Sequence, residues 1–142
     1  MLAACIQYPD GLRREQLTVL TGYKRSTRDA YIQRVRERGF VELAGELVVA
    51  TDAGRDALPN AAPLPTGVEL QDFWRAKLPE GERKILEVLL DAHPKAVARE
   101  ELGERTGFQR STRDAYLQRM RAKQLVTEPS RGEVKASDNL FT

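Results

Sequence analysis

Apolar residues in the second half of the chain recur with the spacing of a helix. Between residues 82 and 92 they stand at positions 85, 86, 88, 89, 90 and 92, which together make one broad face. This pattern stops before His93 and Pro94, and proline is poorly tolerated inside a helix. A short second helix and a longer third helix are expected on either side of a turn at Thr106-Gly107. The predicted helices cover residues 82–92, 99–105 and about 110–123.

The first half of the chain predicts the same order of elements, with helices at 1–7, 14–20 and about 25–38. Gly39 can end the third of these helices in a left-handed conformation. Residues 40–51 then predict two short strands around Ala44-Gly45-Glu46, joined as a hairpin with glycine at its turn. Thr51 is a good N-cap for a short closing helix over 52–58. Each half therefore predicts three helices followed by a pair of strands.

One sequence of seven residues, RSTRDAY, occurs at Arg25–Tyr31 and again at Arg110–Tyr116. The similarity extends in the same register, because residues 21–42 align with 106–127 without a gap and 13 of these 22 positions are identical. Further downstream the alignment needs a gap of one residue. The chain therefore contains two copies of one module. A period this long, present only twice, indicates duplicated small domains and not a solenoid of short repeats.

We predict a first module at 1–58, a linker with a connecting helix at 59–78, and a second module at 79–142. The linker is rich in proline and alanine, which favours a semi-rigid spacer, and Trp74 is expected to anchor the connecting helix. Modules of this size are marginal alone, so we expect them to share a helix or an interface. The first helix of the first module is shorter than its counterpart. We expect that a neighbouring module or a partner protein completes it, or that an upstream domain of the same polypeptide precedes it.

Composition limits the class of protein. At 41% hydrophobic and 31% charged residues, the chain has the balance of a soluble globular protein. One cysteine and one histidine allow neither an internal disulfide nor a zinc site, and no apolar run is long enough to cross a membrane. We expect a cytoplasmic protein. No catalytic constellation or phosphate-binding loop is recognisable, so we expect neither an enzyme nor a bound cofactor.

The third helix of each module has two different faces. Spacing of 100° per residue puts Tyr31, Ile32 and Val35 on a predicted core face. The opposite face, called here the reading face, carries Ser26, Asp29, Ala30 and Gln33, with Arg25 and Arg36 on one shoulder. Its counterparts in the second module are Ser111, Asp114, Ala115, Gln118, Arg110 and Arg121. To these candidate binding residues we add Lys24 and Gln109, which precede the two helices, and Arg131 at the predicted tip of the second hairpin.

The reading face has the chemistry of a major-groove surface. Glutamine can bond an adenine edge, arginine a guanine edge, aspartate can accept from cytosine, and alanine permits close approach. Every reading-face residue is identical in the two modules, whereas core positions change among similar apolar types, as at Ile32 and Leu117. Generic solvated faces would show the reverse, because surfaces tolerate substitution better than cores. We interpret the duplicated sequence as one reading surface used twice on double-stranded DNA.

The order of elements is that of a winged helix-turn-helix, and particular residues resemble one family. TG-x-x-RST, the RERGFVE end of the third helix and the ATDAGR that follows the hairpin resemble winged-helix regulators of the MarR kind. The resemblance covers residues 9–58 well and 94–141 more weakly, and it departs at Arg28 and Arg113, where that family usually has a small apolar residue. It implies an α+β fold of two tandem winged helix-turn-helix domains, DNA binding through the third helix and wing, and a role in transcriptional regulation. Proteins of that family are dimers of one winged helix each, so their quaternary structure does not carry over to a chain with two modules. The oligomeric state stays open, and we favour a monomer that acts as a pseudo-dimer.

Charge agrees with DNA binding without requiring it. Residues 13–38 carry eight basic and three acidic side chains, and residues 98–123 carry seven and four, although the whole chain has a net charge of only +2. However, most charged helix faces are solvent-exposed surfaces without a binding function. Asp29 is as well suited to an intramolecular ion pair as to cytosine, and Arg28 and Arg113 are expected to pair with an acid or extend past the core. The alternative function is a protein-interaction module that uses the winged helices as a scaffold.

Overall fold

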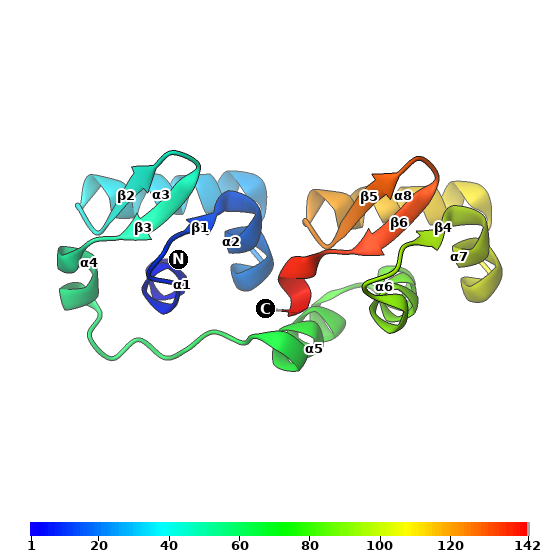
Figure 1. Ribbon diagram of the computed structural model, residues 1–142, viewed down its shortest axis with the longest axis horizontal. Helices are drawn as coiled ribbons and strands as arrows, with labels where there is room; N and C mark the ends of the chain where they lie inside the picture. The colour runs from blue at the N-terminus through cyan, green and yellow to red at the C-terminus, as the bar shows by residue number, and fades with distance from the viewer. Residues whose placement is uncertain (142) are drawn as a thin grey trace. The chain divides into compact units, whose positions relative to one another are not determined.

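The computed structural model describes residues 1–141, which fold into two compact units divided between Pro65 and Thr66 (Figure 1). Each unit combines helices with a three-stranded antiparallel sheet. The described part of the chain contains eight α-helices and two such sheets, so the predicted α+β class is confirmed.

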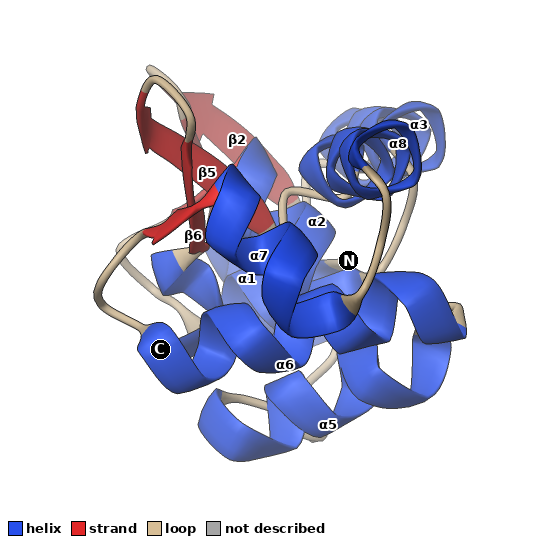
Figure 2. Ribbon diagram, turned by 90° about the vertical axis from the view of Figure 1, so that its right-hand side faces the viewer, coloured by secondary structure: helices blue, strands red, loops and turns tan. Residues whose placement is uncertain are grey.

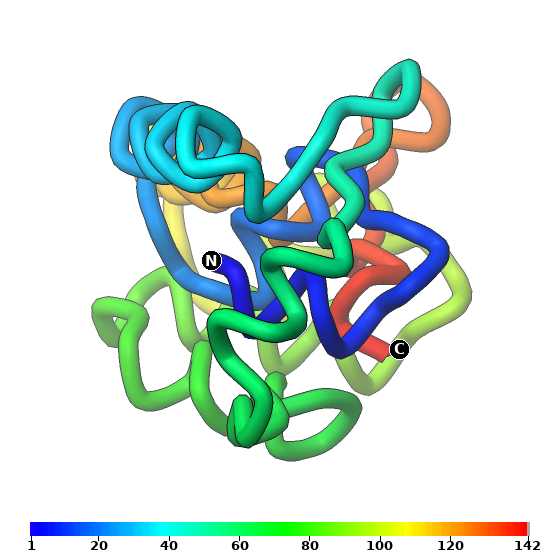
Figure 3. The backbone as a smooth tube through the Cα atoms, turned by 90° about the vertical axis from the view of Figure 1, so that its left-hand side faces the viewer, coloured from blue at the N-terminus to red at the C-terminus, as the bar shows by residue number. Residues whose placement is uncertain are grey.

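In unit 1 one short strand lies between the first two helices, and the other two strands form a hairpin after the third helix. Its strand order is β1-β3-β2, with Leu12 opposite Val48 on one side of β3 and Val41 opposite Ala50 on the other. Figures 1 and 3 both show α3 and the β2–β3 hairpin at the same edge of this unit, away from α1. The elements are α1 (Leu2–Gln7), β1 (Leu12–Arg13), α2 (Arg14–Thr21), α3 (Arg25–Glu37), β2 (Val41–Ala44), β3 (Leu47–Ala50) and α4 (Asp52–Ala57).

Unit 2 repeats this order after one additional helix. Its sheet has the order β4-β6-β5, and a register irregularity lies between Thr127 and Ser130 of β5. In Figure 2, α8 and the β5–β6 hairpin lie on the same side of the unit, with α5 and α6 on the other. The elements are α5 (Gly67–Lys77), α6 (Glu80–Ala92), β4 (Val97–Ala98), α7 (Arg99–Thr106), α8 (Arg110–Ala122), β5 (Val126–Ser130), β6 (Glu133–Ala136) and the 3-10 helix η1 (Asp138–Phe141).

The turn between the second and third helices is built identically in both units. Gly22 and Gly107 have φ angles of 74° and 79°, which glycine adopts without steric cost. The preceding threonine hydroxyl donates to a carbonyl four residues back, at 2.6 Å for Thr21 to Leu17 and 2.7 Å for Thr106 to Leu102. The repeated Thr-Gly pair is therefore explained by the turn itself.

The predicted helices agree with the structure to within about two residues at each end, and the predicted capping role of Thr51 is confirmed. Its hydroxyl accepts the amide hydrogen of Gly54 at 3.1 Å. The short strands β1 and β4 and the helix η1 were not predicted. A strand of two residues is too short to show an alternating pattern, so it is defined by pairing with β3 or β6 alone.

The connecting helix α5 packs within unit 2. Trp74 is buried there, and Gln71 donates to the carbonyl of Leu140 in η1 at 3.1 Å. Arg75 pairs with Glu87 of α6, which joins the two helices. Part of the linker before it is held by unit 1, because the side-chain amide of Gln7 bonds the backbone of Leu64 in both directions, at 2.7 and 3.3 Å.

The residue after the third helix differs between the units at one constrained position. Gly39 and its counterpart Gln124 both have positive φ angles, of 75° and 63°, and the following residue closes the same backbone hydrogen bond. A side chain in the left-handed region costs roughly 1 to 2 kcal/mol. Nothing lies within 4 Å of a Cβ placed on Gly39, so backbone strain alone separates the two residues.

We therefore expect Gln124→Gly to stabilise unit 2 by about 1 kcal/mol, and Gly39→Gln to destabilise unit 1 by a similar amount. The chain carries separate probes for the two measurements. Trp74, the one tryptophan, reports urea unfolding of unit 2 by fluorescence. Cys5, the one cysteine, is buried in α1, and burial raises the pKa of its thiol to about 11, so its labelling rate reports opening of unit 1. A stabilising effect of Gly39→Gln would contradict the strain argument.

Candidate nucleic-acid interface

The predicted reading-face residues lie on α3 in unit 1 and on α8 in unit 2. Lys24 and Gln109 are the N-caps of these helices, and Arg25 and Arg110 are their first residues. The structure brings each set together on one helix. Most of the predicted side chains are exposed, namely Lys24, Arg25, Ser26, Gln33 and Arg36 in unit 1 and Gln109, Arg110, Ser111, Gln118 and Arg121 in unit 2.

Arg28, beside the reading face, is a structural side chain. It is 5% exposed, and its Nη1 donates to the hydroxyl of Thr18 at 2.9 Å and to the carbonyl of Arg14 at 3.2 Å. Its Nε donates to Asp29 Oδ1 at 3.0 Å. The prediction that this arginine pairs with an acid is confirmed. Arg28 therefore links α2 to α3, which fixes the angle at which the reading face is presented.

Unit 2 contains the same arrangement around Arg113. Its Nη1 donates to the carbonyl of Arg99 at 2.8 Å, and its Nε donates to Asp114 Oδ1 at 2.9 Å. The hydrogen bond from Arg113 is the main cause that lowers the pKa of Asp114 below its ordinary value, and the charge of Arg99 acts in the same direction. Asp114 is thus a carboxylate at neutral pH and is already engaged by two arginines.

The intramolecular role weighed for Asp29 is present in the structure. Besides Arg28, Arg14 of α2 approaches its carboxylate at 3.6 Å. The identity of the Arg-Asp pair in the two copies therefore has a structural explanation that needs no DNA. The exposed side chains around it, such as Ser26 and Gln33, are not explained in this way.

Gln33 and Gln118 differ in their neighbours. Gln33 donates to Glu37 Oε1 at 3.2 Å, one turn along α3. Ala122 stands at the equivalent position of α8, so this hydrogen bond has no counterpart there. The amide of Gln33 must release Glu37 before it can bond a base in two places, whereas Gln118 is exposed without that constraint.

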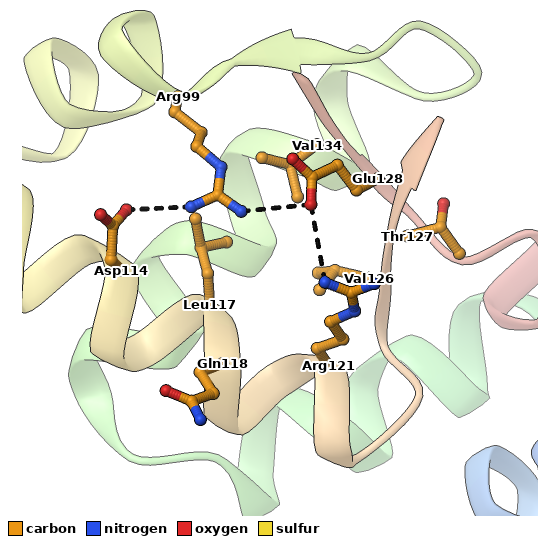
Figure 4. A pocket seen from close by; sticks show the side chains of 9 residues that line it. All are labelled: Arg99, Asp114, Leu117, Gln118, Arg121, Val126, Thr127, Glu128 and Val134. Atoms are coloured by element: carbon orange, nitrogen blue, oxygen red, sulfur yellow. Dashed lines mark hydrogen bonds and ion pairs between the residues drawn. The ribbon is translucent and has the colours of Figure 1, made fainter. Parts of the chain in front are cut away.

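An open groove of about 460 Å³ lies between α8 and β5 in unit 2 (Figure 4). Glu128 of β5 reaches across it, and its Oε2 lies 3.3 Å from Arg99 Nη2 and 3.5 Å from Arg121 Nη1. Its other oxygen, Oε1, accepts the amide hydrogen of Gly132 at the hairpin tip, at 3.3 Å. Glu128 thus ties the helix α8, the start of α7 and the hairpin together. Sequence reasoning missed this residue.

Unit 1 has a corresponding groove of about 530 Å³ with a different residue at that position. Leu43 of β2 aligns with Glu128, while Arg14 and Arg36 align with Arg99 and Arg121. Among residues 1–141, no carboxylate lies within 4.0 Å of Arg36. The substitution of Leu43 by Glu128 beside conserved arginines is the signal in the repeat alignment that could have identified this site.

The hairpin tips also differ. Glu46 and Gly45 form the turn between β2 and β3, and Arg131 and Gly132 form the turn between β5 and β6. Both charged side chains are exposed. Arg131 lies where it was predicted, at the end of the second hairpin. No helix in the described part of the chain is long and apolar enough to span a membrane.

Within residues 1–141, no group of three histidine, cysteine, aspartate or glutamate side chains is arranged to hold a metal ion. Comparisons of this chain with protein-family models, with curated proteins and with solved structures gave no match. Function is therefore inferred from the geometry of α3, α8 and the hairpins beside them.

Proposed function

We propose that this chain is a double-stranded DNA-binding module composed of two tandem winged helix-turn-helix domains. In each unit, α3 or α8 enters the major groove and the neighbouring hairpin acts as a wing against the backbone. α2 and α7 cross behind the reading helices, held to them by Arg28 and Arg113. A chain that reads two like half-sites in this way suits transcriptional control.

The observation that carries this proposal is the pattern of identity on α3 and α8. Once the structural Arg-Asp pair is set aside, seven further polar or small residues of α3 are identical in α8, although the exposed Glu37 is replaced by Ala122. They are Arg25, Ser26, Thr27, Ala30, Gln33, Arg34 and Arg36, matched by Arg110, Ser111, Thr112, Ala115, Gln118, Arg119 and Arg121. Buried positions differ over the same stretch, with Leu117 in place of Ile32. Retention of exposed residues beside a changing core indicates selection on the surface.

The charge of this surface supports a phosphate-bearing partner. Arg25 and Arg110 stand in the first turn of their helices, and Arg36 and Arg121 stand three turns later on the same shoulder. Arginines spaced along one shoulder of a recognition helix can follow the phosphates that border the major groove. Arg131 extends this basic surface to a wing, whereas Glu46 does not.

The salt dependence of binding to random duplex DNA tests this proposal. Five or six phosphate contacts predict a slope of log Kobs against log salt of about −5, and a loss of roughly a thousand-fold in affinity between 50 and 200 mM salt. A protein-interaction module predicts no such dependence. Absent or salt-insensitive binding of the intact chain to duplex DNA would contradict the proposal and favour that alternative.

A further inference from the structure

The two grooves beside the reading helices are each lined by two arginines and two carboxylates, but the second carboxylate comes from a different element. It is Glu37 of α3 in unit 1 and Glu128 of β5 in unit 2. In unit 2, one carboxylate oxygen of Glu128 faces both Arg99 and Arg121 across the groove. The Glu128 side chain is only 24% exposed. In unit 1, the apolar Leu43 occupies the same position, and Arg14 and Arg36 keep their charges without that partner. Glu37 accepts a hydrogen bond from Gln33 on its own helix and, in the described part of the chain, forms no ion pair with Arg36, whereas Glu128 pairs with Arg121. The two grooves therefore differ in how their arginines are paired and not in net charge.

A carboxylate held between two guanidinium groups resembles a bound phosphate in charge and geometry. Arginine binds both groups through the same planar set of N–H donors. Glu128 accepts a hydrogen bond from Arg99 and forms an ion pair with Arg121, so its carboxylate stands where a DNA phosphate would meet these two arginines. The register irregularity of β5 between Thr127 and Ser130 lies at this residue, and the bond from Gly132 to Glu128 Oε1 holds the carboxylate toward α8.

We propose that the two units are unequal DNA-binding surfaces, with Glu128 acting as an internal competitor for phosphate in unit 2. Unit 1, with Leu43, supplies the stronger backbone contact through Arg36. Unit 2 keeps the same exposed glutamine and serine but binds the backbone less tightly. Glu128 is thus a residue that sets affinity without reading a base. This inference rests on the proposed DNA-binding function.

The inference is tested in the intact chain by removing the hairpin carboxylate from one groove or adding one to the other, and measuring affinity for random duplex DNA. Glu128→Gln keeps the shape of the side chain and removes its charge. It should strengthen binding roughly tenfold at 0.1 M salt and steepen the salt slope by about one phosphate contact. Leu43→Glu should weaken binding and make the slope shallower by similar amounts. In the parent chain, Arg36→Ala should reduce the slope by about one, and Arg121→Ala should change it little.

Charge-matched controls separate a local effect from a change in net charge. Asp91→Asn removes one exposed carboxylate from α6, and Leu58→Glu adds one at the end of α4. Both should change affinity far less than the groove variants, and the fluorescence of Trp74 confirms that unit 2 remains folded. If Glu128→Gln behaves like Asp91→Asn while the parent binds DNA with a steep salt slope, this inference is wrong and the proposed function stands. If the parent shows no salt-dependent binding, both are overturned.

Discussion

Replacing Arg25 and Arg110 together by alanine should weaken binding to duplex DNA by about 1 to 3 kcal/mol for each side chain. Both arginines are exposed at the first position of a reading helix, where they can bond a guanine edge or a phosphate. Neither participates in any ion pair of the described residues, so the melting temperature should hardly change. Affinity is measured by titration of labelled duplex, and stability by thermal unfolding of the same samples.

The double variant Arg55→Ala with Arg83→Ala is the matched control. It removes one exposed arginine from each unit, and neither residue lies on α3 or α8. Its affinity for DNA should fall only slightly, because charges outside the reading helices act through the long-range field alone. A comparable loss in both double variants, or a large fall in melting temperature for the Arg25 and Arg110 pair, would mean that these arginines do not contact DNA directly.

A second large effect is expected at the buried ion pair of unit 2. Glu82 of α6 is 1% exposed, and Lys123, just after α8, donates to its Oε1 at 2.6 Å. Lys123→Met should lower the free energy of unfolding of unit 2 by about 3 kcal/mol, because it leaves a buried carboxylate without its cation. Urea unfolding followed by the fluorescence of Trp74 measures this unit.

Two further variants show whether the loss comes from the unpaired charge. Glu82→Met combined with Lys123→Met should recover most of the stability, because the buried charge is gone and apolar contacts replace it. Arg38 holds the position of Lys123 in unit 1 and is exposed, so Arg38→Met should change stability by no more than about 0.5 kcal/mol. A double variant no more stable than Lys123→Met alone would contradict the role given to the buried carboxylate.

The local elements of this fold were predictable from the sequence because their signals are local. The spacing of apolar residues in α6, the Thr-Gly turns and the capping threonine of α4 each act within a few residues. Duplication helped the prediction, because two diverged copies of one module had to satisfy the same pattern. The strands β1 and β4 could not be predicted, since two residues carry no periodicity and their pairing partners lie more than thirty residues away.

The candidate site was predictable only in part. Angular position along a helix was sufficient to place Ser26 and Gln33 on the exposed face and Arg28 beside the core. It was not sufficient to assign Asp29, whose partners come from both α2 and α3. Glu128 was missed because its partners Arg99 and Arg121 come from two different helices, which the sequence pattern of a strand does not reveal.

The structural role of Asp29 and Asp114 narrows what the reading face can recognise. Each carboxylate is held by two arginines, so bonding a cytosine amino group requires it to share its oxygens. The exposed glutamines are better placed for base contact, because a glutamine bonds adenine in two places. We therefore expect the sequence preference of each unit to depend on Gln33 and Gln118 more than on the aspartates.

Selection of bound sequences from a random pool of duplex DNA tests the central claim most directly. Two reading helices of the same chemistry predict two similar half-sites at one fixed spacing, about 10 to 10.5 base pairs or a multiple for helices on one face of the duplex. Gln118→Ala should relax preference in one half-site only, and Gln33→Ala together with Gln118→Ala should abolish sequence preference while salt-dependent binding remains. A single unrepeated half-site, or an unchanged selection with Gln118→Ala, would contradict the claim that the duplicated helix reads DNA twice.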